Sequence, residues 1–187
     1  AMVERIGKVA VDLLHAEPVK AGSYTVIIDP LLAGVFAHEA FGHLSEADTV
    51  ADNQRLQALM KPGTRFGVDE LAIVDDATLP GERGSFRFDD EGAAGERTEL
   101  IKDGVLVGRL HDRQTAAKMG EGVTGNARAM SYRHVPLVRM SNTFIEPRDQ
   151  NIEEMMDGVE DGLYVCGSQG GNTELESFTF AAQYAWR

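Results

Sequence analysis

The chain has 187 residues, of which 43% are hydrophobic and 26% are charged, and this composition excludes wholesale disorder. At this length it can bury one core, either as a single domain or as one large piece of a longer protein. The formal net charge of −12 argues against a nucleic-acid partner, because an acidic surface repels the phosphate backbone.

The N-terminal quarter of the sequence predicts two helices separated by a short strand. Residues 3–14 place apolar side chains at helical spacing, and the β-branched residues of 24–28 then favour a strand. Asp29 and Pro30 suit the N-cap and the first turn of a helix. Residues 31–46 are largely apolar, so they predict a helix that is buried.

Beyond residue 53 the apolar periods shorten and predict mainly strands. Asp112 and Gly120 are the expected start and stop of a short helix over 113–119. Pro136 places one of the strands at a sheet edge or a bulge. The predicted strands of this central part cover residues 71–74, 85–88, 98–101, 105–110 and 131–140.

The C-terminal part predicts one helix and one strand. Asn151 caps a helix that runs to Val159, and alternate aromatic and apolar residues then lie on one face of a final strand over 178–186. That strand meets the last residue without a turn, so we expect residues 1–187 to be a fragment. The expected fold class is α+β, a mostly antiparallel, barrel-like sheet domain with one buried helix.

The number of cysteines and the hydropathy of the sequence indicate the cellular compartment. A single cysteine excludes an internal disulfide framework and favours a reducing, cytoplasmic compartment. No apolar run approaches the roughly 20 residues that a membrane span needs, so we expect no membrane partner.

The segment His38-Glu39-Ala40-Phe41-Gly42-His43 carries the chemistry. Imidazoles are good zinc ligands, and a glutamate beside the first one can polarise a water on the metal. The histidines are five residues apart, and an ideal α-helix would leave their rings about 140° apart. One π-type turn would bring them onto one face, and Gly42 makes such a turn sterically easier. Gly42→Val is therefore expected to impair metal binding without unfolding the protein.

A second interpretation treats His38 and His43 as core histidines that backbone groups satisfy. Burial of ionisable side chains without partners is unfavourable, however, and the segment places two histidines around a glutamate in an apolar helix. The metal interpretation is therefore favoured, and both stay open on chemistry alone.

Four ordered blocks resemble the TldD/PmbA family, in its TldD-type branch. They are VIIDPLLAGVFAHEAFGHLSEAD, GSFRFDDEGAAGERTELIKDGVLVGRLHDRQTAAKMG, TGNARAMSYRHVPLVRMSNTFIEP and GLYVCGSQGGNTE. The resemblance implies a zinc metallopeptidase that cleaves short or unfolded peptides, with His38 and His43 as zinc ligands and Glu39 as the general base. It also implies a homo- or heterodimer with a homologous TldD/PmbA-type subunit.

Two departures from the family pattern concern the ends of the chain. Full-length relatives carry an N-terminal domain before this region, and their third zinc ligand is a cysteine downstream of the GSQGGNTE block. The one cysteine here, Cys166, precedes that block, and its setting predicts an apolar core residue. Cys166, His111 and His134 are therefore considered only as substitute ligands.

A peptide-binding role is suggested for residues 126–140. An edge strand there could hold an extended peptide, with Asn126 and Arg128 contacting the substrate. Alternatively, the arginines of this stretch balance nearby acids. For the whole chain, the alternative to a peptidase is a non-catalytic peptide-binding or assembly module that pairs with a homologous subunit.

Overall fold

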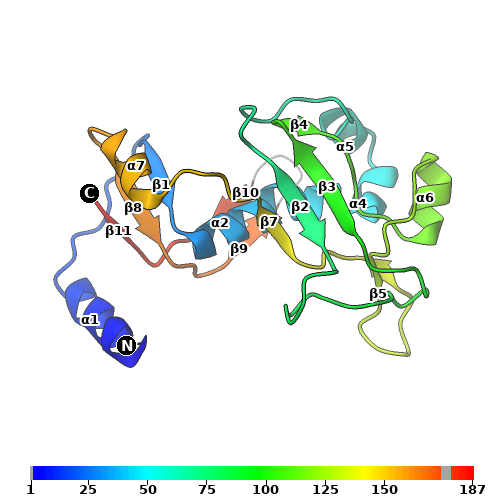
Figure 1. Cartoon of the computed structure of the whole chain (residues 1–187), viewed down its shortest axis with the longest axis horizontal. Coiled ribbons are helices and arrows are strands. Elements are labelled where there is room, and N and C mark those ends of the chain that lie inside the picture. Colours follow the sequence, from blue (N-terminus) through cyan, green and yellow to red (C-terminus); the bar gives the residue numbers. More distant parts are fainter. Residues whose placement is uncertain (1, 174–177) are drawn as a thin grey trace.

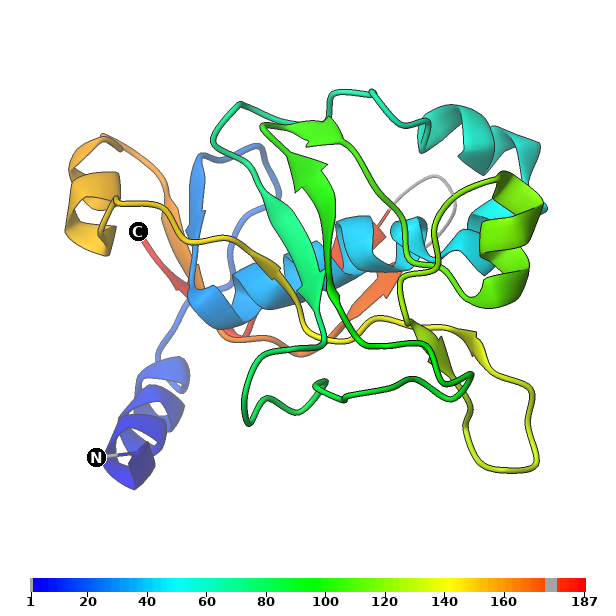
Figure 2. The same ribbon diagram turned by 45° about the vertical axis from the view of Figure 1, so that its right-hand side comes forward.

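The computed structural model describes residues 2–173 and 178–187 of the chain. Figures 1 and 2 show two lobes, with the helical run that begins at α2 passing from one to the other. The helices are α1 Met2–Leu13, α2 Pro30–Ala37, the π-helical turn η1 His38–Gly42, α3 His43–Ser45, α4 Ala47–Ala51, α5 Gln54–Leu59, α6 Arg113–Met119 and α7 Ile152–Asp157. The strands are β1 Val26–Ile28, β2 Ile73–Asp76, β3 Arg97–Lys102, β4 Val105–Leu106, β5 Ala127–Arg128, β6 Leu137–Val138, β7 Thr143–Ile145, β8 Leu163–Cys166, β9 Gly171–Thr173, β10 Phe178–Phe180 and β11 Tyr184–Trp186.

The strands form separate sheets, and those of the described residues do not close into a barrel. Their orders are β4-β3-β2-β7, β1-β8-β11, β9-β10 and β5-β6. Within the described part of the chain, β1 and β8 pair in parallel, and the other pairs of named strands are antiparallel. The expected α+β class with mostly antiparallel strands is confirmed, and the barrel-like closure is not observed.

The central helical run starts at a well-defined cap. The Asp29 carboxylate accepts from the backbone N–H of Leu32 at 2.8 Å, and Pro30 occupies the first turn, as predicted. The second Asp29 oxygen accepts from the N–H of Gly167 at 3.0 Å. One side chain therefore caps the helix and attaches it to the end of β8.

The main core lies between this helical run and the four-stranded sheet. Leu100, Ile101 and Leu106 of the sheet are fully buried, so truncation of any one to alanine is expected to cost about 2–5 kcal/mol. The core residues are Ala37, Ala40, Phe41, Met60, Ile73, Leu100, Ile101, Leu106, Leu110, Val138 and Met140.

Two predicted strands of the central region are wrong over most of their length. Residues 85–88 make only an isolated bridge between Phe88 and Ala94, and Phe88 is exposed. Of residues 131–140, only Leu137–Val138 forms a strand, and 131–136 is an exposed turn. The alternating pattern did not identify a strand over 131–135, because those side chains are exposed and have no buried face to cover, whereas burial within 131–140 is confined to its end, at Val138 and Met140.

The predicted C-terminal strand is two strands in different sheets. Phe178–Phe180 pairs with β9, whereas Tyr184–Trp186 pairs with β8. Between them, Ala181 and Gln183 donate backbone hydrogen bonds to Gly170 and Cys166. Trp186 is 52% exposed, so the expected buried aromatic face does not extend to the end of the chain.

The strand predicted over 105–110 is confirmed only at Val105–Leu106, and Leu110 makes an isolated bridge with Glu46. Several other local predictions hold. Asp112 and Thr115 form a capping box on α6, and the hairpin between β3 and β4 turns at Asp103 and Gly104, which both have positive φ. The N-terminal helix α1 and the helix α7 are present, and neither has buried residues. None of the helices described is long and apolar enough to cross a membrane.

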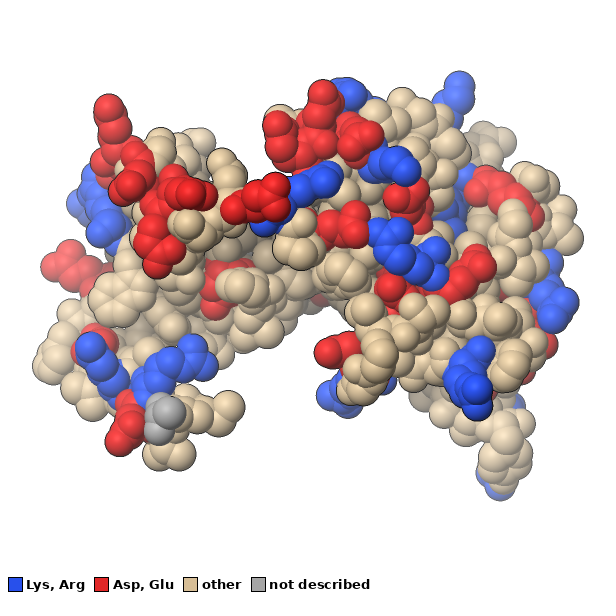
Figure 3. Space-filling view, in the orientation of Figure 1, with Lys and Arg blue, Asp and Glu red and all other residues tan. Residues whose placement is uncertain are grey.

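Charged side chains are unevenly spread over the surface. On the face in Figure 3, Asp and Glu side chains gather on the lobe that carries α7, whose first turn holds Glu153 and Glu154. Over the other lobe, Lys and Arg side chains are interspersed with acids. The net charge of −12 is therefore not offset on this face by a continuous basic patch.

Candidate active site

A π-helical turn sets the geometry of the two motif histidines. The backbone N–H of His43 donates to the carbonyl of His38, which is the i→i+5 bond of a π-turn. Their ring centroids lie 4.6 Å apart with an interplanar angle of 82°. The predicted π-turn is confirmed, and it brings onto one face two rings that an ideal α-helix would separate.

Gly42 is required in this turn for a reason that spacing alone did not reveal. A Cβ at this position would collide with the sulfur of Met140, a buried core residue on the segment before β7. The backbone of Gly42 is helical, so its role is close packing rather than an unusual backbone angle.

Glu46 supports the second histidine. Its Oε2 lies 3.0 Å from Nδ1 of His43 and 3.5 Å from the guanidinium of Arg139, and the side chain is 4% exposed. Its other oxygen, Oε1, has no hydrogen-bond partner within the described residues. Because Nδ1 is occupied, Nε2 is the nitrogen of His43 that remains for a ligand.

The two histidines differ in proton affinity. Burial lowers the pKa of His38, and the neighbouring His43 lowers it further. The hydrogen bond that His43 donates to Glu46 raises the pKa of His43 above the ordinary histidine value, although burial opposes that shift. The neutral form, which binds metal, is thus favoured at His38 relative to an ordinary histidine, whereas a proton competes more strongly for His43.

Glu39 is held between the helix and strand β9. The Thr173 hydroxyl donates to its Oε2 at 2.6 Å, with the backbone oxygen of Glu39 2.7 Å away. A Cβ on Gly171 would lie 2.8 Å from Oε1 of Glu39. The glycine therefore allows β9 to approach the carboxylate, and the threonine orients it.

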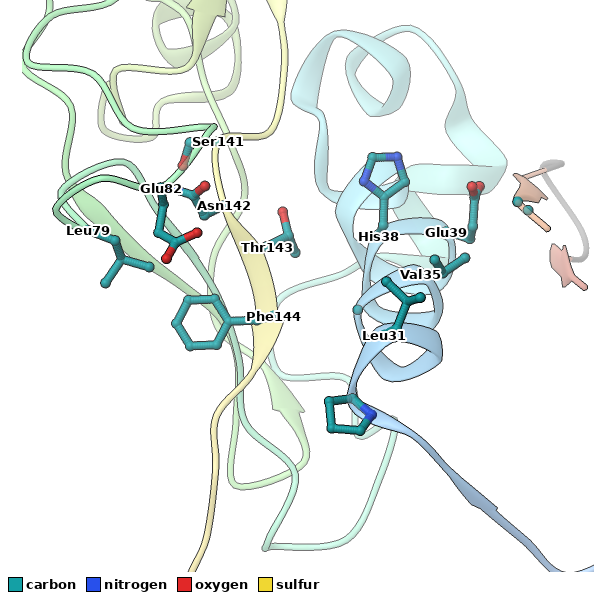
Figure 4. Close-up of a pocket in the computed structure, with 14 residues that line it drawn as sticks. Leu31, Val35, His38, Glu39, Leu79, Glu82, Ser141, Asn142, Thr143 and Phe144 are labelled. Atoms are coloured by element: carbon teal, nitrogen blue, oxygen red, sulfur yellow. The ribbon is translucent and has the colours of Figure 1, made fainter. Parts of the chain in front are cut away.

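A pocket of about 760 Å³ opens beside His38 and Glu39. Figure 4 shows the helix that carries both side chains next to β7, with Thr143 on the side of the strand that faces the helix and Glu39 on the side of the helix away from the strand. β7 is an edge strand of its sheet. The pocket is lined by Pro30, Leu31, Gly34, Val35, His38, Glu39, Leu79, Glu82, Ser141, Asn142, Thr143, Phe144, Gly170 and Gly171.

No third ligand joins the two histidines within the part of the chain that the structure describes. That part contains no group of three or more His, Cys, Asp and Glu residues that could hold a metal ion. His111 is buried and contacts Thr115 and Glu121. His134 lies in the exposed turn after β5, with its Nδ1 3.0 Å from the hydroxyl of Ser131.

Cys166 is a core residue, as its sequence setting predicted. It is buried at the end of β8. Burial raises the pKa of its thiol, which disfavours the thiolate that binds zinc.

The predicted substrate residues Asn126 and Arg128 do not line the pocket. Asn126 is buried, and its amide donates to Asp75 Oδ2 at 2.9 Å and to the backbone oxygen of Arg139 at 3.0 Å. Arg128 is exposed on β5. Their contact with substrate stays a prediction.

The other wall of the pocket contains functional candidates that sequence reasoning missed. Ser141 and Thr143 line it and bind the buried carboxylate of Asp75. Glu46 was also missed, although its place three residues after His43 was a usable signal for a side chain that supports a ligand.

Comparisons with known proteins identify the family of the chain. Residues 21–187 match the model of the PmbA/TldA metallopeptidase C-terminal domain. A Synechocystis sp. protein named as a metalloprotease is 49% identical over 99% of this chain and 40% of its own length. A Saccharolobus solfataricus protein named as a zinc metalloprotease TldD homolog is 36% identical over 100% of this chain and 42% of its own.

Solved structures show the same fold. A Thermotoga maritima crystal structure has a TM-score of 0.71 and 25% identity, covering 86% of this chain and 36% of that one. TldE from Thermococcus kodakarensis has a TM-score of 0.64 and 20% identity, covering 86% and 39%. The chain thus spans about 40% of the length of the relatives it matches. It belongs to the PmbA/TldA metallopeptidase family and corresponds to that family's C-terminal domain.

Proposed function

We propose that this chain provides the catalytic region of a zinc-dependent peptidase that acts on short or unfolded peptides. The observation that carries the proposal is the π-turn, which places two imidazoles 4.6 Å apart next to a pocket that Glu39 also lines. The names of the relatives as metalloproteases support it.

The residues present fit zinc as part of its ligand set. His38 and His43 would supply two imidazole nitrogens, and the Glu46–His43 pair is the carboxylate–histidine arrangement found behind many metal ligands. Bound zinc supplies a Lewis acid and acidifies the water bound to it. Catalytic zinc sites usually have three protein ligands, and the resemblance assigns the third to a downstream cysteine that this sequence lacks.

Glu39 would act as the general base. Thr173 donates to Oε2, which leaves Oε1 of the same carboxylate to accept a proton from the attacking water. The carboxyl group would then return that proton to the amine of the departing peptide. Thr173 and Gly171 determine where the carboxylate sits during both transfers.

Substrate would bind as an extended chain along the free edge of β7. The backbone of Asn142 is bonded to Asp76 of β2, and that of Glu146 to Ala72 just before β2. By the two-residue alternation, the backbone groups of Thr143 and Ile145 therefore face the opposite edge. That edge lies in the wall of the pocket, where a peptide could add as a further antiparallel strand.

The alternative proposal is a non-catalytic peptide-binding or assembly module that pairs with a homologous subunit. The observation that favours it is the pair of histidines without a third ligand among the described residues. Zinc binding by this chain, and by a chain extended to the length of the relatives, separates the two. Zinc held by neither would favour the alternative.

The test of the catalytic proposal is Glu39→Gln in the extended, zinc-loaded protein. We expect peptide cleavage to be abolished while the zinc content stays at the parent level, because the substitution removes the base and leaves both imidazoles. Glu153→Gln, an exposed position on α7, is the matched control and should cleave normally. Cleavage that survives in Glu39→Gln would show that the assigned base is wrong.

A further inference from the structure

We propose that Asp75 is a positioning residue for substrate, because it fixes the β7 wall of the pocket in place opposite the histidine helix. The proposal rests on the proposed peptidase function. Asp75 lies on β2, directly opposite Thr143 of β7, and is 1% exposed. It is therefore beneath the pocket wall and does not contact substrate itself.

The Asp75 carboxylate uses both of its oxygens to hold that wall. Oδ1 accepts from the hydroxyl of Thr143 at 2.6 Å and the N–H of Ser141 at 2.9 Å. Oδ2 accepts from the hydroxyl of Ser141 at 2.7 Å and the amide of Asn126 at 2.9 Å. Two of the three donor residues, Ser141 and Thr143, line the pocket.

The charge of Asp75 has no cationic partner among the described residues. No Lys, Arg or His of that part forms an ion pair with it, and burial of an unpaired carboxylate is costly unless hydrogen bonds compensate. Each of its two oxygens accepts from an N–H that can only donate, that of Ser141 on Oδ1 and that of Asn126 on Oδ2, so only a group that accepts at both atoms suits the site. An asparagine there would place an NH₂ against donors.

The same carboxylate is linked to the histidine side of the pocket. Asn126, which binds Asp75, also donates to the backbone oxygen of Arg139 at 3.0 Å. The Arg139 guanidinium lies 3.5 Å from Glu46, and Glu46 holds His43.

Asp76 provides a matched control one residue away. It is also buried, but its recorded side-chain bonds, from the N–H and hydroxyl of Thr78, both end on Oδ1. An asparagine at 76 can therefore keep both bonds, whereas an asparagine at 75 cannot.

The experiment compares Asp75→Asn and Asp76→Asn in the extended, zinc-loaded protein, with fluorescein-labelled casein as an unfolded substrate. We expect Asp75→Asn to raise KM at least tenfold, with a smaller change in kcat and unchanged zinc content. Asp76→Asn should stay within about twofold of the parent. An unchanged KM in folded Asp75→Asn, or equal losses in both variants, would overturn the proposal.

Two further variants keep the test decisive if Asp75→Asn does not fold. Ser141→Ala and Thr143→Val each remove one donor to the carboxylate, and each should raise KM about threefold with little change in kcat. If neither changes KM, Asp75 is only a structural residue.

A binding readout separates this proposal from the peptidase proposal. In a Glu39→Gln background, casein should protect residues 141–145 from hydrogen exchange, and Asp75→Asn should remove that protection. If the parent protein cleaves nothing but this protection is observed, the peptidase proposal fails and the positioning role stands. If the protection is absent or insensitive to Asp75→Asn, the positioning role is wrong.

Discussion

The two walls of the pocket are built in different ways. In the helical wall, His38 and Glu39 lie in one π-turn and line the pocket, and His43, which caps that turn, packs against His38. Their relative positions follow from local backbone geometry. In the strand wall, Asp75 holds partners that are 66 and 68 residues away in the sequence. The groups proposed for the chemistry are therefore positioned by local sequence, whereas the surface proposed to receive the peptide depends on long-range pairing of strands.

The comparison implies that substitutions in the two walls change different measured properties. Changes in the helical wall should alter zinc binding or proton transfer. Changes in the strand wall, such as those proposed for Asp75, should alter peptide binding with zinc in place. A variant of the helical wall that affects only KM would break this division.

The largest effect is expected for Gly42→Val. The new side chain collides with Met140 in the core and displaces the π-turn, so the protein should lose about 1–3 kcal/mol of stability and most of its bound zinc. Calorimetric or chemical unfolding and zinc analysis of the purified variant measure both losses.

Two controls show whether the Met140 contact is the cause. Gly34→Val changes a helical glycine whose Cβ would meet nothing within 4 Å, so zinc should remain bound. The cost of Gly42→Val should be smaller in a Met140→Ala background. An equal cost in both backgrounds would rule out the packing explanation.

Glu46→Gln should weaken zinc binding by about 10- to 100-fold, the usual effect of losing a carboxylate behind a histidine ligand. The substitution keeps the shape of the side chain and removes the charge that orients His43. Competition with a chromophoric chelator measures the affinity. Parent-like affinity in Glu46→Gln would mean that the His43 contact does not support the metal.

Gly171→Ala should lower kcat about tenfold and leave the zinc content unchanged, since a Cβ there lies 2.5 Å from Cγ of Glu39 and displaces the base. Gly122→Ala, whose Cβ meets nothing within 4 Å, is the control and should have no effect. Steady-state cleavage assays measure kcat for both variants and the parent. An unaffected kcat in Gly171→Ala would show that the carboxylate tolerates the displacement.

The smallest effect is a difference in titration between the two histidines of the metal-free protein. By NMR, the pKa of His43 should lie above the ordinary histidine value because of Glu46, and that of His38 below it because of burial. The folded state then binds the His43 proton more tightly than the unfolded state does. Protonation of His43 therefore stabilises the folded state at pH values below the ordinary histidine pKa. This stabilisation is lost as pH rises through the pKa of His43 in the folded protein.

The same titration determines how zinc affinity changes with pH. Protons compete with zinc for both imidazoles, so affinity should fall as pH falls, beginning near the pKa of His43. In Glu46→Gln the pKa of His43 should move down. An unmoved pKa in that variant would contradict the assigned cause.

The sequence allowed prediction of the π-turn because His38 and His43, at their five-residue spacing, can share one metal only if the helix contains such a turn. It also allowed prediction of the caps at Asp29 and Asp112, where one side chain decides the start of a helix. It did not allow prediction of β7, because the strand predicted over 131–140 ends before β7 begins at Thr143. Burial decides which segments pair, and the pairing of Asp75 with Thr143 has no local signature.

The most direct test of the metal centre is a zinc-edge X-ray absorption measurement on the extended, zinc-loaded protein and its His43→Ala variant. We expect two imidazole ligands at about 2.0–2.1 Å in the parent and one in the variant. An imidazole count that is the same in both proteins would contradict the central claim, that the π-turn brings His38 and His43 together to hold one zinc ion.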